Sequence, residues 1–268
     1  MESPVSMMAT LGGMHAGHEA LLHRARREGR SLVASLFLNP TQFNDAADLE
    51  RYPRDVDRDL AIFERHGVDV VFKPTVDEMY PPGHVTVVDP GPLGAMLEGA
   101  HRAGHFLGVA TVVAKLLSVI RPDIAVWGAK DAQQNIVIRR MSQDLCLNVK
   151  HVIEPTVRAE DGLALSSRNA RLSVAERQAA PVLFGALSGA RALWDGGERR
   201  AEVLRRCVRD MVNGEALTEL EYVSVAEPVA LRELEQIVPG AVVSLAAVVG
   251  STRLIDNVLL EGPPAPNS

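Results

Sequence analysis

Short apolar runs that alternate with helix-like segments restrict the fold of this sequence more than any other feature. The run at residues 31–38 shows no polar–apolar alternation, and three further short strand-like runs follow at residues 68–72, 124–127 and 149–153; all four stop close to a proline or a glycine. Continuous apolarity is typical of strands that are covered on both faces, as in a parallel sheet. The segments before and between them have helical spacing, at residues 19–27, 55–66, 108–120 and 132–145. We therefore predict an α/β fold with a Rossmann-like parallel sheet and helices on both faces.

The pattern changes after residue 156. Two long segments favour helices and two apolar segments favour strands, at residues 174–194, 200–212, 222–225 and 241–249. We predict that residues 1–156 form the Rossmann-like domain. Residues 157–268 are expected to form a smaller α+β lid domain, whose proline-rich tail (residues 262–268) frays.

Charge and cysteine usage exclude several classes of protein. The 268 residues include 28 basic and 34 acidic side chains, a net charge of −6 without a basic stripe, so nucleic acid is not an expected partner. The longest apolar stretch, residues 109–120, is too short to span a bilayer, and no cationic leader precedes it, so we expect a cytoplasmic protein. Cys146 and Cys207 lack metal-site spacing and are predicted to be buried thiols.

Ligands of parallel sheets bind beyond the carboxyl ends of the strands, and polar clusters lie there in this sequence. The first cluster, residues 10–18, combines glycines with His15 and His18 just ahead of a predicted helix. Glycines allow a ligand close to the backbone, free N–H groups at a helix start suit phosphate, and imidazoles can donate to oxygens that gain charge. Taken alone, the cluster also fits a glycine turn with two surface histidines.

Three further clusters offer polar groups of other kinds. Residues 39–43 place Asn and Gln at a strand end, where uncharged groups can hold a carboxylate or hydroxyl. Residues 128–134 place Lys130 as a mobile charge for phosphate, with Gln134 one helical turn beyond. Residues 165–169 combine two hydroxyls with a guanidinium, which can clamp a polyphosphate. A self-capping turn, a surface Lys–Asp pair and a polar linker are the respective structural alternatives.

Together and in this order, the clusters resemble the pantoate–β-alanine ligase family, within the nucleotidyltransferases with HIGH and KMSKS-type motifs. The H-x-G-H and N-P-x-Q-F patterns of that family are present as His15-Ala16-Gly17-His18 and Asn39-Pro40-Thr41-Gln42-Phe43. Further matching motifs lie at residues 51–54, 155–169 and 250–257, and at residues 102–106, where Ala103 replaces the Pro of the family. The resemblance therefore covers nearly the whole chain.

The resemblance implies an ATP-dependent condensation of pantoate with β-alanine. The pantoate carboxylate would attack the α-phosphate of ATP, and the amine would then displace AMP from the pantoyl adenylate. The catalytic residues it implies are His15, His18, Lys130, Ser166, Ser167 and Arg168, with His18 as proton donor. Mg²⁺ would bridge the phosphates, with Asp59 as a candidate in its surroundings, and the enzyme would be a homodimer.

The resemblance also implies binding residues. Gln42 and Gln134 would hold pantoate, and Gln42 would also lie near β-alanine. The residues implied for ATP are Leu11, Gly12, Gly13, Met14, His15, Ala16, Gly17, His18, Gly128, Ala129, Lys130, Asp131, Val157, Leu165, Ser166, Ser167 and Arg168.

Several residues depart from the family pattern. Ala129 and Ala132 replace Glu and Tyr, Ala9 replaces Pro, and Trp127 stands where Phe is common in the wall of the pantoate pocket. Two alternatives therefore stay open. One is a related ligase for another carboxylate or amine, and the other is a nucleotide-binding homologue without turnover.

Overall fold

The structure is a computed structural model that describes residues 1–262. The predicted fraying of the tail falls mainly on residues 263–268, outside this range. The chain divides into two compact units, and each is described by itself. The first comprises residues 1–129 and 133–157; the second comprises residues 130–132 and the chain from residue 158 onward.

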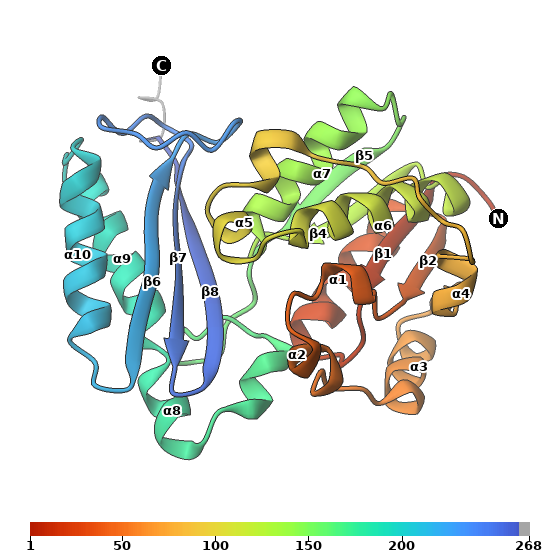
Figure 1. Ribbon diagram of the computed structural model, residues 1–268, viewed down its shortest axis with the longest axis horizontal. Coiled ribbons are helices and arrows are strands. Elements are labelled where there is room, and N and C mark those ends of the chain that lie inside the picture. Colours follow the sequence, from red (N-terminus) through yellow and green to blue (C-terminus); the bar gives the residue numbers. More distant parts are fainter. Residues whose placement is uncertain (263–268) are drawn as a thin grey trace. The chain divides into compact units, whose positions relative to one another are not determined.

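The first unit is built on a five-stranded parallel sheet in the order β3-β2-β1-β4-β5 (Figure 1). Its strands are β1 (Val5–Thr10), β2 (Ser31–Leu36), β3 (Val70–Phe72), β4 (Ile124–Gly128) and β5 (Lys150–Glu154). Its main helices are α1 (Ala16–Glu28), α3 (Val56–Arg65), α6 (His105–Ile120) and α7 (Ala132–Asp144). Shorter turns of helix are η1 (Pro40–Gln42), α2 (Ala46–Glu50), α4 (Val76–Met79), η2 (Gly91–Gly94) and α5 (Glu98–His101).

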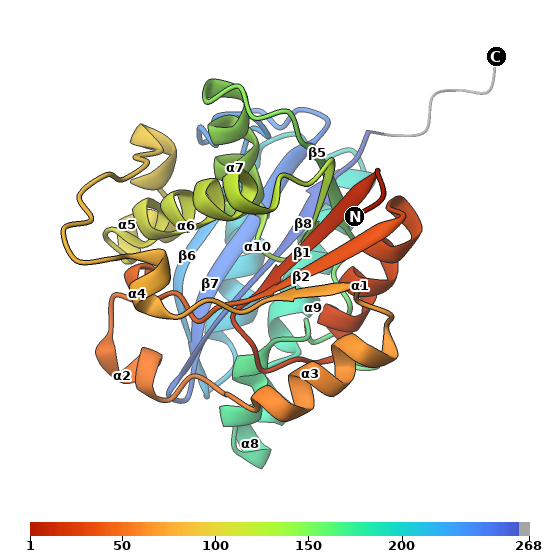
Figure 2. The same ribbon diagram turned by 90° about the vertical axis from the view of Figure 1, so that its right-hand side faces the viewer.

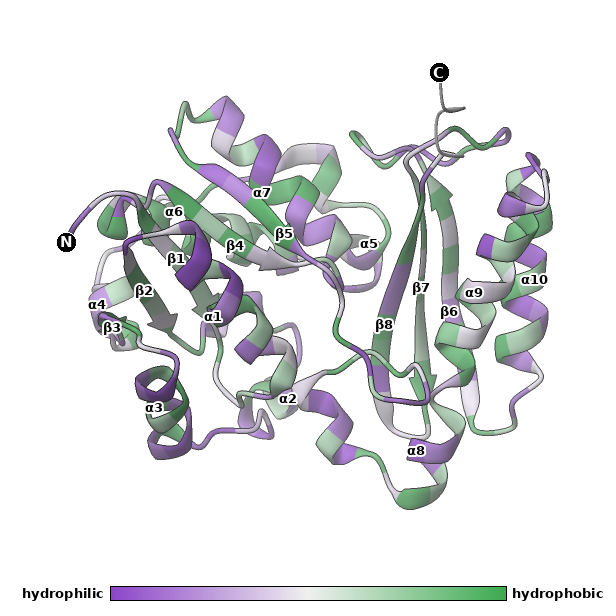
Figure 3. Cartoon of the chain, turned by 180° about the vertical axis from the view of Figure 1, so that it is seen from behind, coloured by the Kyte–Doolittle hydropathy of each residue, from purple (hydrophilic) through white to green (hydrophobic). Residues whose placement is uncertain are grey.

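Helices cover both faces of this sheet, as predicted (Figure 2). Leu22 of α1 and Phe63 of α3 pack on one face against Met8 of β1. On the other face, Val109 of α6 and Val137 of α7 belong to a second apolar cluster. Figure 3 shows that α1 and α3 carry many hydrophilic residues, whereas β1, β2 and β4 are largely hydrophobic.

The central strand β1 is the main element that the sequence analysis missed. It pairs with β2 on one side, Val5 opposite Ser31, and with β4 on the other, Ser6 opposite Ile124. The chain builds β1, β2 and β3 in one direction and then returns to place β4 beyond β1. Ligands of such sheets bind at the carboxyl edge where the order reverses, here between β1 and β4.

Two other predictions about the elements and one about the cysteines are wrong. The strand at residues 68–72 is not buried: Val70 is 43% exposed because β3 lies at the edge of the sheet, next to β2 alone. The helix at residues 174–194 is two helices, since Pro181 lacks the N–H that would continue the first one. Cys146 is exposed and Cys207 is partly exposed, so the prediction of two buried thiols is wrong as well.

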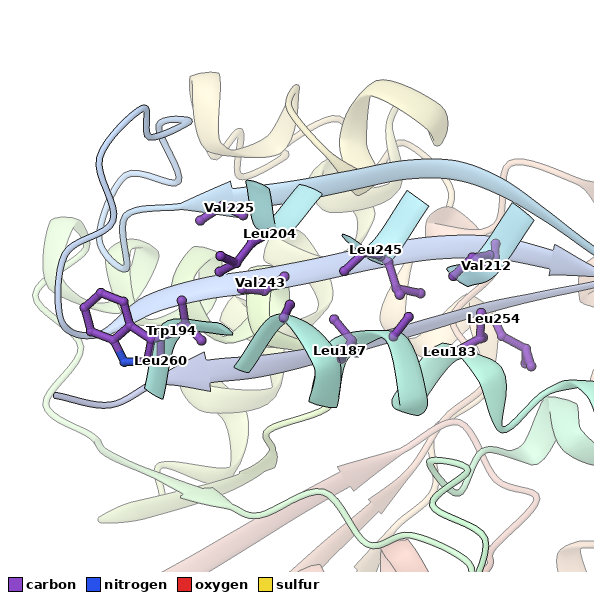
Figure 4. Close-up of a cluster of buried hydrophobic side chains, with 14 of the residues drawn as sticks. Leu183, Leu187, Trp194, Leu204, Val212, Val225, Val243, Leu245, Leu254 and Leu260 are labelled. Carbon is purple, nitrogen blue, oxygen red and sulfur yellow. The ribbon is translucent and has the colours of Figure 1, made fainter. Parts of the chain in front are cut away.

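The second unit packs two helices on one face of an antiparallel sheet in the order β6-β7-β8. Its elements are η3 (Ser167–Arg171), α8 (Val174–Ala179), α9 (Val182–Asp195), α10 (Ala201–Asn213), β6 (Thr218–Ala226), β7 (Ala241–Val249) and β8 (Thr252–Leu260). Its core includes Leu187 of α9, Leu204 of α10 and Leu245 of β7 (Figure 4). The α/β architecture with a smaller α+β unit is therefore confirmed.

Within residues 1–262, no helix combines the length and apolarity that crossing a membrane requires.

Candidate functional site

A glycine loop joins the carboxyl end of β1 to α1. Gly12 has φ +97°, a conformation that L side chains rarely adopt, and its N–H donates to Thr10 Oγ1 at 3.1 Å. An added Cβ would also lie 3.0 Å from Asp59 Oδ2. Glycine at position 12 is therefore required both by the backbone conformation and by the close approach of Asp59.

Asp59, on the first turn of α3, fixes the next two residues of this loop. Its Oδ2 accepts the N–H of Gly13 and its Oδ1 accepts the N–H of Met14, both at 2.9 Å. Only 1% of Asp59 is exposed. Because a buried carboxylate must be compensated, these two charge-assisted hydrogen bonds hold the loop and the carboxylate together.

His15 and His18 form a reciprocal cap at the start of α1. The N–H of Gly17 donates to His15 Nδ1 at 3.1 Å, and the N–H of His15 donates to His18 Nδ1 at 3.3 Å. The ring centroids are 4.1 Å apart. Since each Nδ1 accepts, the ring proton of each neutral imidazole lies on Nε2. The H-x-G-H pattern therefore folds into a capping box that places the ring protons of His15 and His18 on Nε2. Both residues follow the carboxyl end of β1, where the strand order reverses.

Free N–H groups were expected at the start of this helix, and most N–H groups of the loop that leads into it are already hydrogen-bonded. In the structure the N–H groups of Gly12, Gly13, Met14, His15 and Gly17 all donate to acceptors within the protein. The imidazoles and the positive end of the α1 dipole are thus the features that suit an anion here.

The second cluster lies at the carboxyl end of β2. Asn39 is fully buried and caps η1, and its Nδ2 donates to Gln42 Oε1 at 3.0 Å. The Gln42 carbonyl oxygen lies 2.8 Å from His105 Nδ1, at the start of α6. Gln42 is therefore positioned through both its side chain and its backbone.

A series of hydrogen bonds inside the first unit begins at Trp127, near the end of β4. Trp127 Nε1 donates to His151 Nδ1 at 3.0 Å, and His151 Nε2 lies 2.9 Å from Ser142 Oγ. Burial, with the nearby Arg139 charge, lowers the pKa of His151 from 6.5 to about 4, so the ring is neutral at physiological pH. A neutral ring is also what the indole needs, because Nδ1 must keep its lone pair to accept.

The remaining predicted residues of the first unit lie at the same edge of the sheet or on the adjoining helix. Gly128 ends β4, and its carbonyl oxygen accepts from Asn135 Nδ2 at 2.8 Å. Ala129 N–H donates to the carbonyl oxygen of Glu154 at 2.8 Å. Gln134 lies in the first turn of α7, and Val157 is the last residue of this unit.

Lys130 and Asp131 group with the second unit. The Lys130 ammonium lies 3.7 Å from Asp131 Oδ1, and its backbone oxygen accepts from Asn257 Nδ2 of β8 at 2.7 Å. Arg158 pairs with the buried Asp256 through two contacts of 2.6 and 2.9 Å. Sequence reasoning gave Asn257 and Asp256 no role, although both lie in the 250–257 motif.

The cluster at residues 165–169 also belongs to the second unit. Ser166 caps η3, with its Oγ accepting the N–H of Arg168 at 3.2 Å. Asn169 Nδ2 donates to the Ala164 carbonyl oxygen at 3.0 Å. Leu165 precedes this cap and Ser167 begins η3, so the segment is an ordered turn of helix rather than an extended linker. The predicted site residues therefore form two sets, one in each unit.

The side chains of residues 1–262 do not form a protein-held magnesium site. No group of three or more His, Cys, Asp or Glu residues suited to a metal ion occurs in the part of the chain from residue 1 to 262. Each oxygen of Asp59 already accepts a backbone N–H. Asp59 therefore fits a role in holding the loop better than one as a ligand of Mg²⁺.

Comparison with known proteins identifies the family. A sequence profile described as pantoate-beta-alanine ligase matches residues 1–259. Pantothenate synthetase of Roseiflexus castenholzii is 50% identical over 261 residues, 97% of this chain and 94% of that protein. The Chloroflexus aurantiacus pantothenate synthetase is 52% identical over 259 residues, 96% of this chain and 92% of that protein.

Solved structures agree with these sequence relatives. The pantothenate synthetase of Thermus thermophilus has a TM-score of 0.93 and 44% identity, covering 97% of this chain and 94% of that one. A pantoate-beta-alanine ligase of Francisella tularensis, complexed with beta-gamma ATP and β-alanine, has a TM-score of 0.78 and 31% identity, with coverage of 97% and 91%. These findings confirm the resemblance: the chain belongs to the pantoate–β-alanine ligase family.

Proposed function

We propose that this chain is an ATP-dependent ligase that condenses pantoate with β-alanine through a pantoyl adenylate. The observation that carries the proposal is the histidine capping box, which fixes the orientation of His15 and His18 at the carboxyl edge of a parallel sheet, beside the strand where the order reverses. The ATP- and β-alanine-bound ligase of Francisella tularensis, which this chain covers almost completely, supports the choice of substrates.

In the first step, a carboxylate oxygen of pantoate attacks the α-phosphorus of ATP. The bond to the bridging oxygen breaks and pyrophosphate leaves. In the second step, the amine of β-alanine attacks the acyl carbon, the carbon–oxygen bond to AMP breaks, and the ammonium proton is lost. The adenylate is already reactive, so positioning of the amine supplies much of the second barrier.

The chain's own residues would supply donors and charge. We assign His15 and His18 to oxygens of the phosphates, with His18 as proton donor, because their Nε2 atoms carry the ring protons. Lys130 and Arg168 would neutralise phosphate charge, and Ser166 and Ser167 would donate to phosphate oxygens. Gln42 and Gln134 would hold pantoate. We also assign to ATP binding the other residues that the resemblance implies, at positions 11–18, 128–131, 157 and 165.

Magnesium would be held by the phosphates of the nucleotide rather than by a carboxylate cluster, since Asp59 is occupied by the loop. We further propose a cytoplasmic homodimer, as the family resemblance implies, with residues 1–156 and 157–268 as its two domains. Gel filtration with light scattering measures the oligomeric state.

A ligase for a different carboxylate is the second candidate, and Trp127 is the observation that favours it. The Trp127 indole N–H donates to His151 Nδ1 at 3.0 Å. The protein therefore accommodates an indole where the family commonly has the smaller ring of Phe. Two smaller residues, Ala129 and Ala132, flank Lys130 and Asp131 in the same motif. Substitutions of this kind reshape a pocket and are a route to altered specificity.

One assay tests these candidates. AMP release is measured with pantoate and β-alanine, each alone and both together, and ATP–pyrophosphate exchange is measured with pantoate and with other short hydroxy acids. AMP release that needs both substrates supports the proposed ligase. Exchange with another acid alone supports the second candidate, and ATP binding without turnover indicates a non-catalytic homologue.

His18→Ala tests the histidine assignment. Loss of one donor at developing charge lowers kcat by about 10²–10³-fold. His23→Ala, at an exposed position of the same helix, is the matched control and leaves the rate unchanged. A normal rate for His18→Ala would remove His18 from the mechanism.

A further inference from the structure

The side-chain amide of Asn39 has one defined orientation, because a backbone group hydrogen-bonds to its oxygen and another to its nitrogen. The Thr41 N–H can only donate, and it donates to Asn39 Oδ1 at 3.3 Å. The Gly108 carbonyl oxygen can only accept, and it accepts from Asn39 Nδ2 at 3.3 Å. The assignment of oxygen and nitrogen therefore follows from two groups that cannot exchange roles.

Asn39 transmits this polarity to Gln42. The second proton of Asn39 Nδ2 goes to Gln42 Oε1, 3.0 Å away. The side-chain oxygen of Gln42, Oε1, therefore already accepts a hydrogen bond within the protein. No hydrogen-bond acceptor for Gln42 Nε2 occurs among residues 1–262, and the side chain is only partly buried. Gln42 therefore presents a donor, its NH₂ group, at the carboxyl edge of the sheet.

Close packing with α6 keeps this network in place. A Cβ on Gly108 would lie 2.3 Å from the Thr41 carbonyl oxygen, so only glycine allows α6 to approach the 39–42 turn. His105 Nδ1, one turn earlier on α6, is 2.8 Å from the Gln42 carbonyl oxygen. The backbone of Gln42 therefore has little freedom to move its side chain away.

Tyr80 makes the shortest hydrogen bond to the Asn39 amide. Its hydroxyl donates to Asn39 Oδ1 at 2.8 Å. The ring is itself held by an edge contact with His84, at 5.1 Å between centroids, and by the Lys115 ammonium 5.1 Å above its face. Burial raises the pKa of the Tyr80 phenol, so the hydroxyl keeps its proton throughout the physiological range. No motif of the sequence analysis includes Tyr80.

We propose that Tyr80 is a positioning residue for the acid substrate: with Asn39 it orients Gln42 so that Nε2, and not Oε1, meets the substrate. Gln42 then recognises a hydrogen-bond acceptor, a carboxylate or hydroxyl oxygen of a short hydroxy acid. This inference rests on the proposed function and adds to it the direction of the hydrogen bond from Gln42 to the substrate and the side chain, Tyr80, that holds the Asn39 amide in place.

The polarity is tested by comparing Gln42→Glu with Gln42→Met. A glutamate at this position still accepts from Asn39, but it presents an anionic oxygen to an acceptor of the substrate. A methionine presents no polar group at all. In pantoate-dependent ATP–pyrophosphate exchange we expect the KM for pantoate to be at least about tenfold higher for Gln42→Glu than for Gln42→Met. A Gln42→Glu variant that binds pantoate as well as Gln42→Met would overturn the inference.

The role of Tyr80 is tested with Tyr80→Phe, which keeps the ring and removes only the donor. We expect the KM for pantoate to rise about three- to tenfold, the effect of one hydrogen bond, with the KM for ATP unchanged. Tyr222→Phe, on β6, is the matched control and shifts neither constant. A rise in both constants, or in neither, contradicts the positioning role.

The two proposals fail in different ways. A wild-type protein without pantoate-dependent exchange would refute the proposed function, and this inference would fall with it. A wild-type protein with that exchange, whose Gln42 and Tyr80 variants do not show the predicted split, would overturn the inference alone.

Discussion

Replacing Asp59 tests whether a buried carboxylate holds the glycine loop. Asp59→Asn keeps one acceptor oxygen but turns the other into an NH₂ group that faces a backbone N–H, at Gly13 or Met14. One charge-assisted hydrogen bond is lost and two donors are opposed in a site that is 1% exposed. A buried group left without its partner costs about 1–3 kcal/mol, and more when charge is involved. We therefore expect a loss of about 2–3 kcal/mol in the free energy of unfolding, and about 3–5 kcal/mol for Asp59→Ala.

The assay combines urea unfolding, without nucleotide or Mg²⁺, with ATP–pyrophosphate exchange. Because the loop carries His15 and His18, its displacement lowers kcat/KM by about tenfold or more. Asp57→Asn, on the exposed side of α3, is the matched control and changes neither quantity. A variant Asp59→Asn with wild-type stability and a raised Mg²⁺ requirement would refute the loop-holding role and favour metal binding.

Two other predictions concern buried polar contacts. Because folding lowers the pKa of His151 from 6.5 to about 4, this group stabilises the fold fully above pH 6.5 and loses that contribution as the pH falls towards 4. Protonation of His151 also removes the acceptor of the Trp127 indole N–H. In a Trp194→Phe variant, the fluorescence of Trp127 should therefore change with a midpoint near pH 4. A midpoint near pH 6.5 would refute the argument that burial lowers the pKa. Asp256→Asn leaves the Arg158 guanidinium without its buried partner and should cost about 3 kcal/mol in urea unfolding, whereas wild-type stability would show that the pair contributes nothing.

The sheet was predictable where its strands are continuously apolar, as at residues 31–38 and 124–127. The central strand β1 was missed because its sequence, VSMMAT, contains few of the β-branched and aromatic residues that mark strands. The edge strand β3 was placed but expected to be buried, since strand order across a sheet is not encoded in local periodicity. Pro181 was the local signal that could have divided the helix at residues 174–194.

The candidate site was predictable as a set of motifs but not as a set of contacts. His15 and His18 were singled out by type and spacing, although the helix was expected to begin at residue 19 and begins at Ala16. The role of Asp59 depends on contacts with residues 45 and 46 positions earlier, which no local pattern shows. The polarity of Gln42 likewise depends on Tyr80 and Gly108, which the turn meets only in the folded chain.

The central claim is that this chain activates pantoate by attaching it to the α-phosphate of ATP. The most direct measurement uses pantoate labelled with ¹⁸O in its carboxylate, together with ATP and β-alanine, and follows the label by mass spectrometry. If the carboxylate attacks the α-phosphorus, one ¹⁸O appears in the phosphate of AMP. Label in pyrophosphate or inorganic phosphate, or AMP that carries no ¹⁸O, would contradict the account.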